Sequence, residues 1–123
     1  MQIMAKILIV DDSRVSRRML RGILTNAGHE VIGEAENGQD GYEKFIALDP
    51  DIVTMDITMP VLDGLGALEK IMELNSNANI IMVTAAGQKE KMVEAIKHGA
   101  IEFIQKPFDP DQITTAIEHL MPQ

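Results

Sequence analysis

The feature that most constrains the fold is a regular alternation between short apolar runs and longer segments with helical spacing. Apolar runs rich in Ile, Val, Leu and Met occur at residues 6–10, 31–36, 51–55, 79–83 and 100–104. After each run, apolar residues recur every three or four positions, which is the period of an amphipathic helix. Strands that alternate with helices form parallel sheets, because each helix returns the chain to the start of the next strand. The sequence therefore predicts an α/β fold, with a doubly wound five-stranded parallel sheet and five helices.

Capping residues indicate where the predicted helices begin and end. Gly28 and Gly99 are expected to stop the first and fourth helices, and Asn37 is expected to cap the second. Asp109 precedes Pro110, a pair typical of a helix start, so the last helix is predicted to begin there. The following residues are expected to face the core: Tyr42, Phe45 and Ile46 in the second helix, and Met92, Val93 and Ile96 in the fourth.

Composition narrows the class of protein. The chain has 123 residues, of which 46% are hydrophobic, so we expect one folded domain over residues 1–123. The chain has no Cys, which excludes disulfides and thiolate metal sites. The net charge is −8 and no basic run is present, so nucleic-acid binding is not expected. No run reaches the ~20 apolar residues of a membrane span, and the first residues lack a cleavage signal. A cytoplasmic protein with no membrane association is the prediction.

Polar side chains follow most of the predicted strands at the point where each strand ends. Asp11 and Asp12 follow the first apolar run, Asp56 the third, Thr84 the fourth and Lys106 the fifth. In open α/β sheets, functional sites form at the carboxyl ends of the strands. These side chains are therefore predicted to meet at one rim of the sheet.

Three carboxylates at one rim repel one another. Two unit charges about 4 Å apart cost roughly 4 kcal/mol at an effective dielectric of 20. Either one carboxyl keeps a proton or a cation lies between them. Oxygen ligands with room for water favour Mg²⁺. Lys106 and the Thr84 hydroxyl add donors for a phosphoryl group, so the set is suited to phosphoryl transfer.

Each of these residues also has an ordinary structural interpretation. Asp12 or Ser13 could simply cap the first helix, and Asp56 could be a loop residue. Thr84 alone is typical of a strand end, and Lys106 alone is typical of a solvated charge. Their joint placement at one rim is what favours a functional site.

With these residues in view, the chain resembles the receiver domains of bacterial two-component systems, and most closely their stand-alone chemotaxis regulators. The resemblance extends from about residue 6 to the end. It is carried by these runs: Ile7-Leu8-Ile9-Val10-Asp11-Asp12, Asp51-Ile52-Val53-Thr54-Met55-Asp56-Ile57-Thr58-Met59-Pro60 with Asp63-Gly64, Val83-Thr84-Ala85, and Lys106-Pro107-Phe108.

The resemblance implies a fold and a metal site. The sheet would have the flavodoxin-like strand order 2-1-3-4-5. Asp56 would be the phosphoacceptor, with Mg²⁺ as the cofactor. Asp12 and Asp56 would bind the ion directly, together with the backbone carbonyl of Thr58, whereas Asp11 would act through water.

The resemblance also implies a switch. Lys106 would pair with the phosphoryl oxygens, and its bond to Pro107 would be cis. The Thr84 hydroxyl would be drawn toward the phosphoryl group, and Phe103 would then turn inward. The surface of the fourth helix, fifth strand and fifth helix would change with it. Phe103 lacks the hydroxyl of a tyrosine, and Ala86 neither blocks nor activates water strongly, so no lifetime of the phosphorylated state follows.

The function implied is a phosphorylation-dependent signalling switch that catalyses its own phosphorylation and dephosphorylation and is not otherwise an enzyme. A sensor histidine kinase would be the phosphodonor. The output would be contact between a monomer and a protein target, such as a flagellar motor switch protein.

Alternatives differ in class. The chain could be a receiver cut from a longer regulator, for example a transcriptional one. A phosphatase with an Asp nucleophile needs a second Asp two residues after the first, and Thr58 stands there. A flavin-binding carrier needs a loop rich in hydroxyls and glycine after the first strand, where Asp11 and Asp12 would repel a phosphate.

Overall fold

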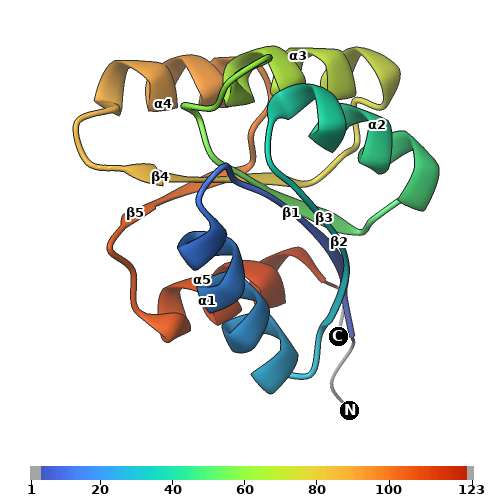
Figure 1. The fold of residues 1–123 in the computed structure, drawn as a ribbon, viewed down its shortest axis with the longest axis vertical. Helices are drawn as coiled ribbons and strands as arrows, with labels where there is room; N and C mark the ends of the chain where they lie inside the picture. The colour runs from blue at the N-terminus through green and yellow to red at the C-terminus, as the bar shows by residue number, and fades with distance from the viewer. Residues whose placement is uncertain (1–3, 122–123) are drawn as a thin grey trace.

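Strands and helices alternate throughout the described part of the chain, residues 4–121 of a computed structural model (Figure 1). The strands are β1 (Lys6–Val10), β2 (Glu30–Ala35), β3 (Ile52–Met55), β4 (Ile80–Ala85) and β5 (Glu102–Lys106). The helices are α1 (Arg14–Asn26), α2 (Gly38–Leu48), α3 (Gly64–Leu74), α4 (Lys89–Lys97) and α5 (Pro110–Leu120). None of these helices is both long enough and apolar enough to cross a membrane.

All strand pairs are parallel, and the strands form one sheet in the order β2-β1-β3-β4-β5. This order confirms the prediction made from the resemblance. The apolar strands β1, β3 and β4 lie inside the sheet, and β2, which carries Glu30 and Glu34, lies at an edge. An edge strand can expose charged side chains to water, and such charges discourage pairing with another chain.

The sheet separates two hydrophobic cores. In Figure 1, α2, α3 and α4 cover one face, and α1 and α5 cover the other. Side chains alternate between faces along each strand: Leu8 and Val10 belong to the first core, and Ile7 and Ile9 to the second. Burial of such a side chain stabilises the fold by roughly 1.5–3 kcal/mol. The two cores therefore pack against the sheet from both sides.

Most predicted caps are confirmed. The hydroxyl of Ser13 accepts from the Ser16 N–H, so Ser13 rather than Asp12 caps α1. Asn37 caps α2, and at the start of α5 the Asp109 N–H donates to Gln112 Oε1 at 2.8 Å. Gly28 has a positive φ of 92°, as expected for a residue that ends a helix.

Strand boundaries differ from the prediction at the rim. Strand β5 covers residues 102–106 instead of 100–104, and β4 extends to Ala85. Thr84 and Lys106 are therefore residues of the strands themselves, whereas the prediction placed them after the strands. Their backbones continue the ladder, with Thr84 opposite Gln105 and Ala85 opposite Lys106, because backbone pairing does not require apolar side chains.

The predicted inward faces of two helices are partly wrong. Ile46 is 53% exposed, because α2 packs through Gly38, Gly41 and Phe45. A Cβ at Gly41 would lie only 2.8 Å from Val10 Cγ1, so this helix approaches the sheet through glycine.

In α4, Met92 and Ala95 are buried, whereas Val93 and Ile96 are exposed. The buried positions are three residues apart, and the next position along a helix is rotated by about 100° away from them. The face that contains Met92 and Ala95 is therefore buried, and Val93 and Ile96, each one position further along, remain in solvent.

Candidate functional site

The register of the sheet brings the acidic side chains together. Val10 at the end of β1 is opposite Met55 at the end of β3, so Asp11 and Asp56 leave adjacent strands at the same level. The Asp56 N–H donates to the Val10 carbonyl at 2.9 Å. Carboxylate oxygens of Asp11, Asp12 and Asp56 lie within 4.8 Å of one another. The predicted convergence at the carboxyl rim is confirmed for these residues.

Lys106 reaches this cluster from β5, the strand at one edge of the sheet. It ends β5, which is separated from β1 by β3 and β4. Its Nζ donates to Asp11 Oδ2 at 2.8 Å and to Asp56 Oδ2 at 3.3 Å. The ammonium group therefore offsets part of the repulsion between the two carboxylates.

Burial and the neighbouring charges shift the pKa values of Asp11 and Lys106. Burial raises the pKa of Asp11, as does the neighbouring charge of Asp56, and hydrogen bonds from Lys106 and the Ser13 N–H oppose this only in part. Burial alone would lower the pKa of Lys106, but its hydrogen bonds and the charges of Asp11 and Asp56 together raise it. The ammonium is thus stabilised, whereas ionised Asp11 carries a residual cost.

The three carboxylates occupy different environments. Asp11 is buried, with Oδ1 accepting from the Ser13 N–H at 2.8 Å and Oδ2 bound to Lys106. Asp56 is nearly buried, and its Oδ1 accepts from the Ile57 N–H at 2.7 Å. Asp12 is exposed. Oxygen donors beside open solvent suit a hard divalent cation that keeps some of its water. Three carboxylates in this arrangement could hold such a cation.

The loop after Asp56 contains a strained turn. The Leu62 N–H donates to the Pro60 carbonyl at 2.8 Å, and Val61 between them has φ of 70°. This is a γ-turn of the strained class, and a β-branched residue rarely adopts it. The Gly38 N–H donates to the Leu62 carbonyl at 2.7 Å, which ties the turn to α2. Val61 is 82% exposed, so its side chain contributes little to packing.

Gly64 allows α3 to approach the backbone of Asp56. A Cβ at Gly64 would lie 2.0 Å from the Asp56 carbonyl oxygen, and the Gly64 N–H donates to the Ile57 carbonyl at 2.7 Å. In the sequence, Gly64 stands out only as part of the runs that carry the resemblance. Its role in the site was missed, because a close approach between segments leaves no local pattern.

The remaining predicted site residues lie near the rim. Thr84 is buried in β4, two residues beyond Met82, and Phe103 in β5 is opposite Met82. Thr84 and Phe103 therefore share one face of the sheet, and Phe103 is 45% exposed. Thr58 lies in the loop after β3, where its Oγ1 accepts from Gln88 Nε2 at 3.4 Å. The individual roles given to these residues stay predictions.

The peptide bond between Lys106 and Pro107 is cis, as the resemblance implied.

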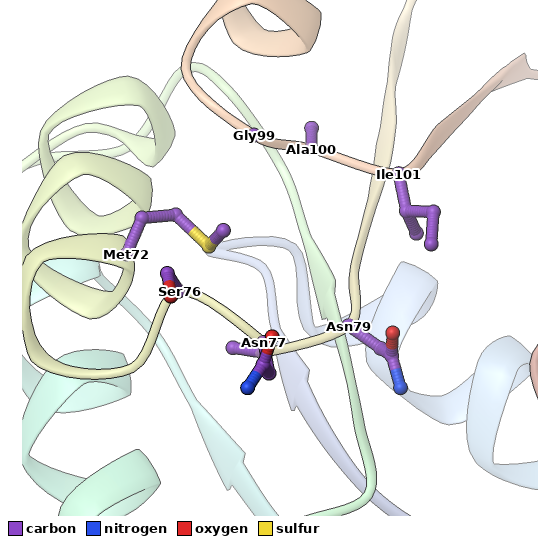
Figure 2. Close-up of a pocket in the computed structure, with 8 residues that line it drawn as sticks. Met72, Ser76, Asn77, Asn79, Gly99, Ala100 and Ile101 are labelled. Carbon is purple, nitrogen blue, oxygen red and sulfur yellow. The ribbon is translucent and has the colours of Figure 1, made fainter.

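A surface pocket of about 490 Å³ lies elsewhere (Figure 2). Met72 and residues 76–79 line one side of it, and residues 99–101 line the other. These segments precede β4 and β5, so the pocket is at the amino ends of the strands. It is therefore on the opposite rim from the acidic cluster and takes no part in that site.

Comparison with known proteins identifies the family of this chain. The model of the response regulator receiver domain matches residues 7–118. The chain belongs to this family. A receiver domain is a signalling protein and not a classical enzyme.

Several receiver proteins are similar over almost their whole length. The chemotaxis protein CheY of Thermotoga maritima is 51% identical over 112 residues, which cover 91% of this chain and 93% of that protein. CheY of Bacillus subtilis is 48% identical, with the same shares covered. A solved CheX-CheY-BeF3-Mg²⁺ complex from Borrelia burgdorferi matches with a TM-score of 0.90 and 35% identity, over 96% of this chain and 90% of that one.

Gly64→Ala is expected to destabilise this receiver domain by at least about 2 kcal/mol, because the new Cβ would overlap the Asp56 carbonyl oxygen. Gly22→Ala is the matched control, since a Cβ at this exposed position of α1 would meet nothing within 4 Å. The control should gain roughly 0.5–1 kcal/mol from helix propensity. Urea unfolding gives both values, and equal shifts in the two variants would contradict the close approach.

Asp11→Asn is expected to gain stability relative to the wild type as the pH rises. The raised pKa of Asp11 means that the folded protein holds this proton more tightly than the unfolded chain. The protonated Asp11 carboxyl therefore contributes its full stabilisation at pH values below its pKa in the unfolded chain. This contribution is lost as the pH rises through its pKa in the folded protein. Asn cannot lose that proton, so the difference in unfolding free energy, variant minus wild type, should increase between roughly pH 3 and pH 7.

Urea midpoints measured across this range in a metal chelator test the Asp11 prediction. A difference that stays flat, or that falls as the pH rises, would show that burial does not control this carboxyl.

Proposed function

We propose that this receiver domain is a phosphorylation switch of chemotaxis in which Asp56 accepts the phosphoryl group. The observation that carries the proposal is the position of Lys106, whose Nζ bonds to both Asp11 and Asp56 inside the acidic cluster. An ammonium group beside a carboxylate nucleophile is suited to receive the oxygens of an incoming phosphoryl group.

The cofactor in this proposal is Mg²⁺, bound directly by Asp12, Asp56 and the Thr58 carbonyl, with Asp11 acting through water. In support, both oxygens of Asp11 accept hydrogen bonds at 2.8 Å, whereas Lys106 is 3.3 Å from Asp56 Oδ2 and Asp12 is exposed. The similar protein from Borrelia burgdorferi was solved with Mg²⁺ and BeF3. When bound, the ion supplies positive charge that offsets the carboxylates and the phosphoryl oxygens.

The chemical step transfers a phosphoryl group from a phosphohistidine of a sensor histidine kinase. An oxygen of Asp56 forms the new P–O bond, the P–N bond breaks, and the released imidazole takes up a proton. The Asp56 Oδ1 is oriented by the Ile57 N–H at 2.7 Å, so Oδ2 on the Lys106 side is the oxygen that we assign to the attack. In dephosphorylation, water attacks phosphorus and the P–O bond to Asp56 breaks.

The output of the switch would be read at the surface of α4, β5 and α5. Thr84 would donate its hydroxyl proton to a phosphoryl oxygen, and Phe103 would move inward into the space that Thr84 leaves. Both side chains lie on the same face of the sheet, and Phe103 is still 45% exposed, which fits the unphosphorylated state. A shift from 1:99 to 99:1 needs about 5.5 kcal/mol, of which charge-assisted bonds from Lys106 and Thr84 would supply a large part.

Partners are inferred from the similar proteins. The relatives in Thermotoga maritima and Bacillus subtilis are chemotaxis proteins, and the Borrelia burgdorferi relative was solved with CheX. We therefore propose a chemotaxis kinase as the phosphodonor, a partner like CheX at the phosphorylated site, and a flagellar motor switch protein as target. A monomeric state, a cytoplasmic location and a single domain over residues 1–123 stay predictions from the sequence.

The test is phosphorylation by a small donor. Protein mixed with Mg²⁺ and acetyl phosphate is expected to gain the mass of one phosphoryl group, and Asp56→Asn should gain none. Asp111→Asn, which removes an exposed carboxylate of α5, is the control and should be phosphorylated like the wild type. Intact-protein mass spectrometry measures all three.

Equal gain of mass in Asp56→Asn, or no gain in the wild type with a donor that phosphorylates another receiver protein, would contradict the proposal.

A further inference from the structure

Arg17 of α1 is a buried cation that contacts the backbone of the acidic cluster. The residue is only 9% exposed, and its Nη1 donates to the Asp11 carbonyl at 2.7 Å in a buried hydrogen bond. Arg17 makes no hydrogen bond or ion pair with the three carboxylates of the described cluster. Its contact is with the peptide unit that joins Asp11 to Asp12.

The Asp11 carbonyl lies where the sheet stops. The Asp11 N–H still bonds to β2, donating to the Ala35 carbonyl at 3.0 Å. The Asp11 carbonyl belongs to the next peptide unit, and Arg17 supplies its hydrogen bond. Because a peptide unit is planar, a fixed carbonyl also fixes the direction in which the chain enters Asp12. Arg17 thus restrains two carboxylates through one bond.

Acidic side chains of β2 and of the residue that follows it bind the guanidinium group of Arg17. Its Nε donates to Glu34 Oε1 at 3.1 Å, and Nη2 lies 3.5 Å from Glu36 Oε1. These contacts orient the planar fork, and they offset its charge beside a site that attracts cations. A lysine carries one point-like ammonium and cannot hold this geometry, so arginine and lysine are not equivalent here.

We propose that Arg17 is a positioning residue for the divalent cation site, acting through the Asp11–Asp12 peptide. This inference rests on the proposed function only in that the acidic triad binds Mg²⁺. Groups that orient metal ligands without touching the metal commonly change its affinity by about 10–100-fold.

Charge and position predict opposite effects for this residue. If Arg17 acted only through its charge, its removal would relieve repulsion and Mg²⁺ would bind more tightly. If Arg17 positions the acid pair, its removal lets the Asp11–Asp12 peptide rotate and Mg²⁺ binds more weakly. The sign of the change in affinity therefore distinguishes the two.

The experiment is an Mg²⁺ titration of the full chain followed by NMR amide shifts, which also report that each variant is folded. Arg17→Met keeps the packed stem but removes the guanidinium, and its Mg²⁺ affinity should fall about tenfold. Arg17→Lys keeps the charge and should also bind more weakly than the wild type. Raising the Mg²⁺ concentration to saturation should restore phosphorylation by acetyl phosphate in both variants.

Arg21→Ala is the matched control. Arg21 lies one turn further along α1 and binds the same Glu34, with Nε 2.6 Å from Oε2. Its removal deletes the same charge without touching the Asp11 carbonyl, so Mg²⁺ affinity should be unchanged or slightly higher.

Mg²⁺ affinity in Arg17→Met equal to or above that of the wild type would overturn the inference. An equal loss in Arg21→Ala would overturn it as well. If Arg17→Met does not fold, Arg17→Lys decides in the same way. A wild-type protein that binds no Mg²⁺ would instead refute the proposed metal site itself, so the two failures are distinguishable.

Discussion

Repulsion between carboxylates at one end of the sheet is the constraint on which the site depends. Oxygens of Asp11, Asp12 and Asp56 lie within 4.8 Å of one another, and at such distances each charged pair costs roughly 4 kcal/mol at an effective dielectric of 20. Lys106 offsets part of this cost from β5, and Arg17 holds the backbone from α1. The two hydrophobic cores supply the stability that keeps the acidic groups together.

The excess of negative charge at this rim also accounts for the proposed activity. The raised pKa of Asp11 means that its ionised form is incompletely compensated in the folded protein, so added positive charge is stabilising. A phosphoryl group on Asp56 would in turn compete for Lys106 and the Thr84 hydroxyl. Because Thr84 and Phe103 lie on one face of the sheet, the proposed switch would carry a change at the rim to the surface of β5 through these two residues.

The sequence was sufficient for the fold and for most of the rim. Strand period and parallel pairing place the polar residues at one rim, and the strand order implied by the resemblance makes β1 and β3 neighbours, so that Asp11 and Asp56 lie side by side. Helix faces were less predictable. Ile46 was expected to be buried, but glycine lets α2 approach the sheet so closely that the buried stripe excludes this residue. The roles of Gly64 and Arg17 were missed, because each depends on one contact between segments that are fixed only in the folded chain.

The most direct test is a crystal structure grown with Mn²⁺ in place of Mg²⁺, with the ion located by its anomalous scattering. The account predicts one strong peak at the carboxyl rim, about 2–2.5 Å from carboxylate oxygens of Asp12 and Asp56. Arg17 should remain bound to the Asp11 carbonyl. A peak at another acidic surface, or an acidic cluster with no peak at saturating Mn²⁺, would contradict the claim that these carboxylates are held together to bind a cation.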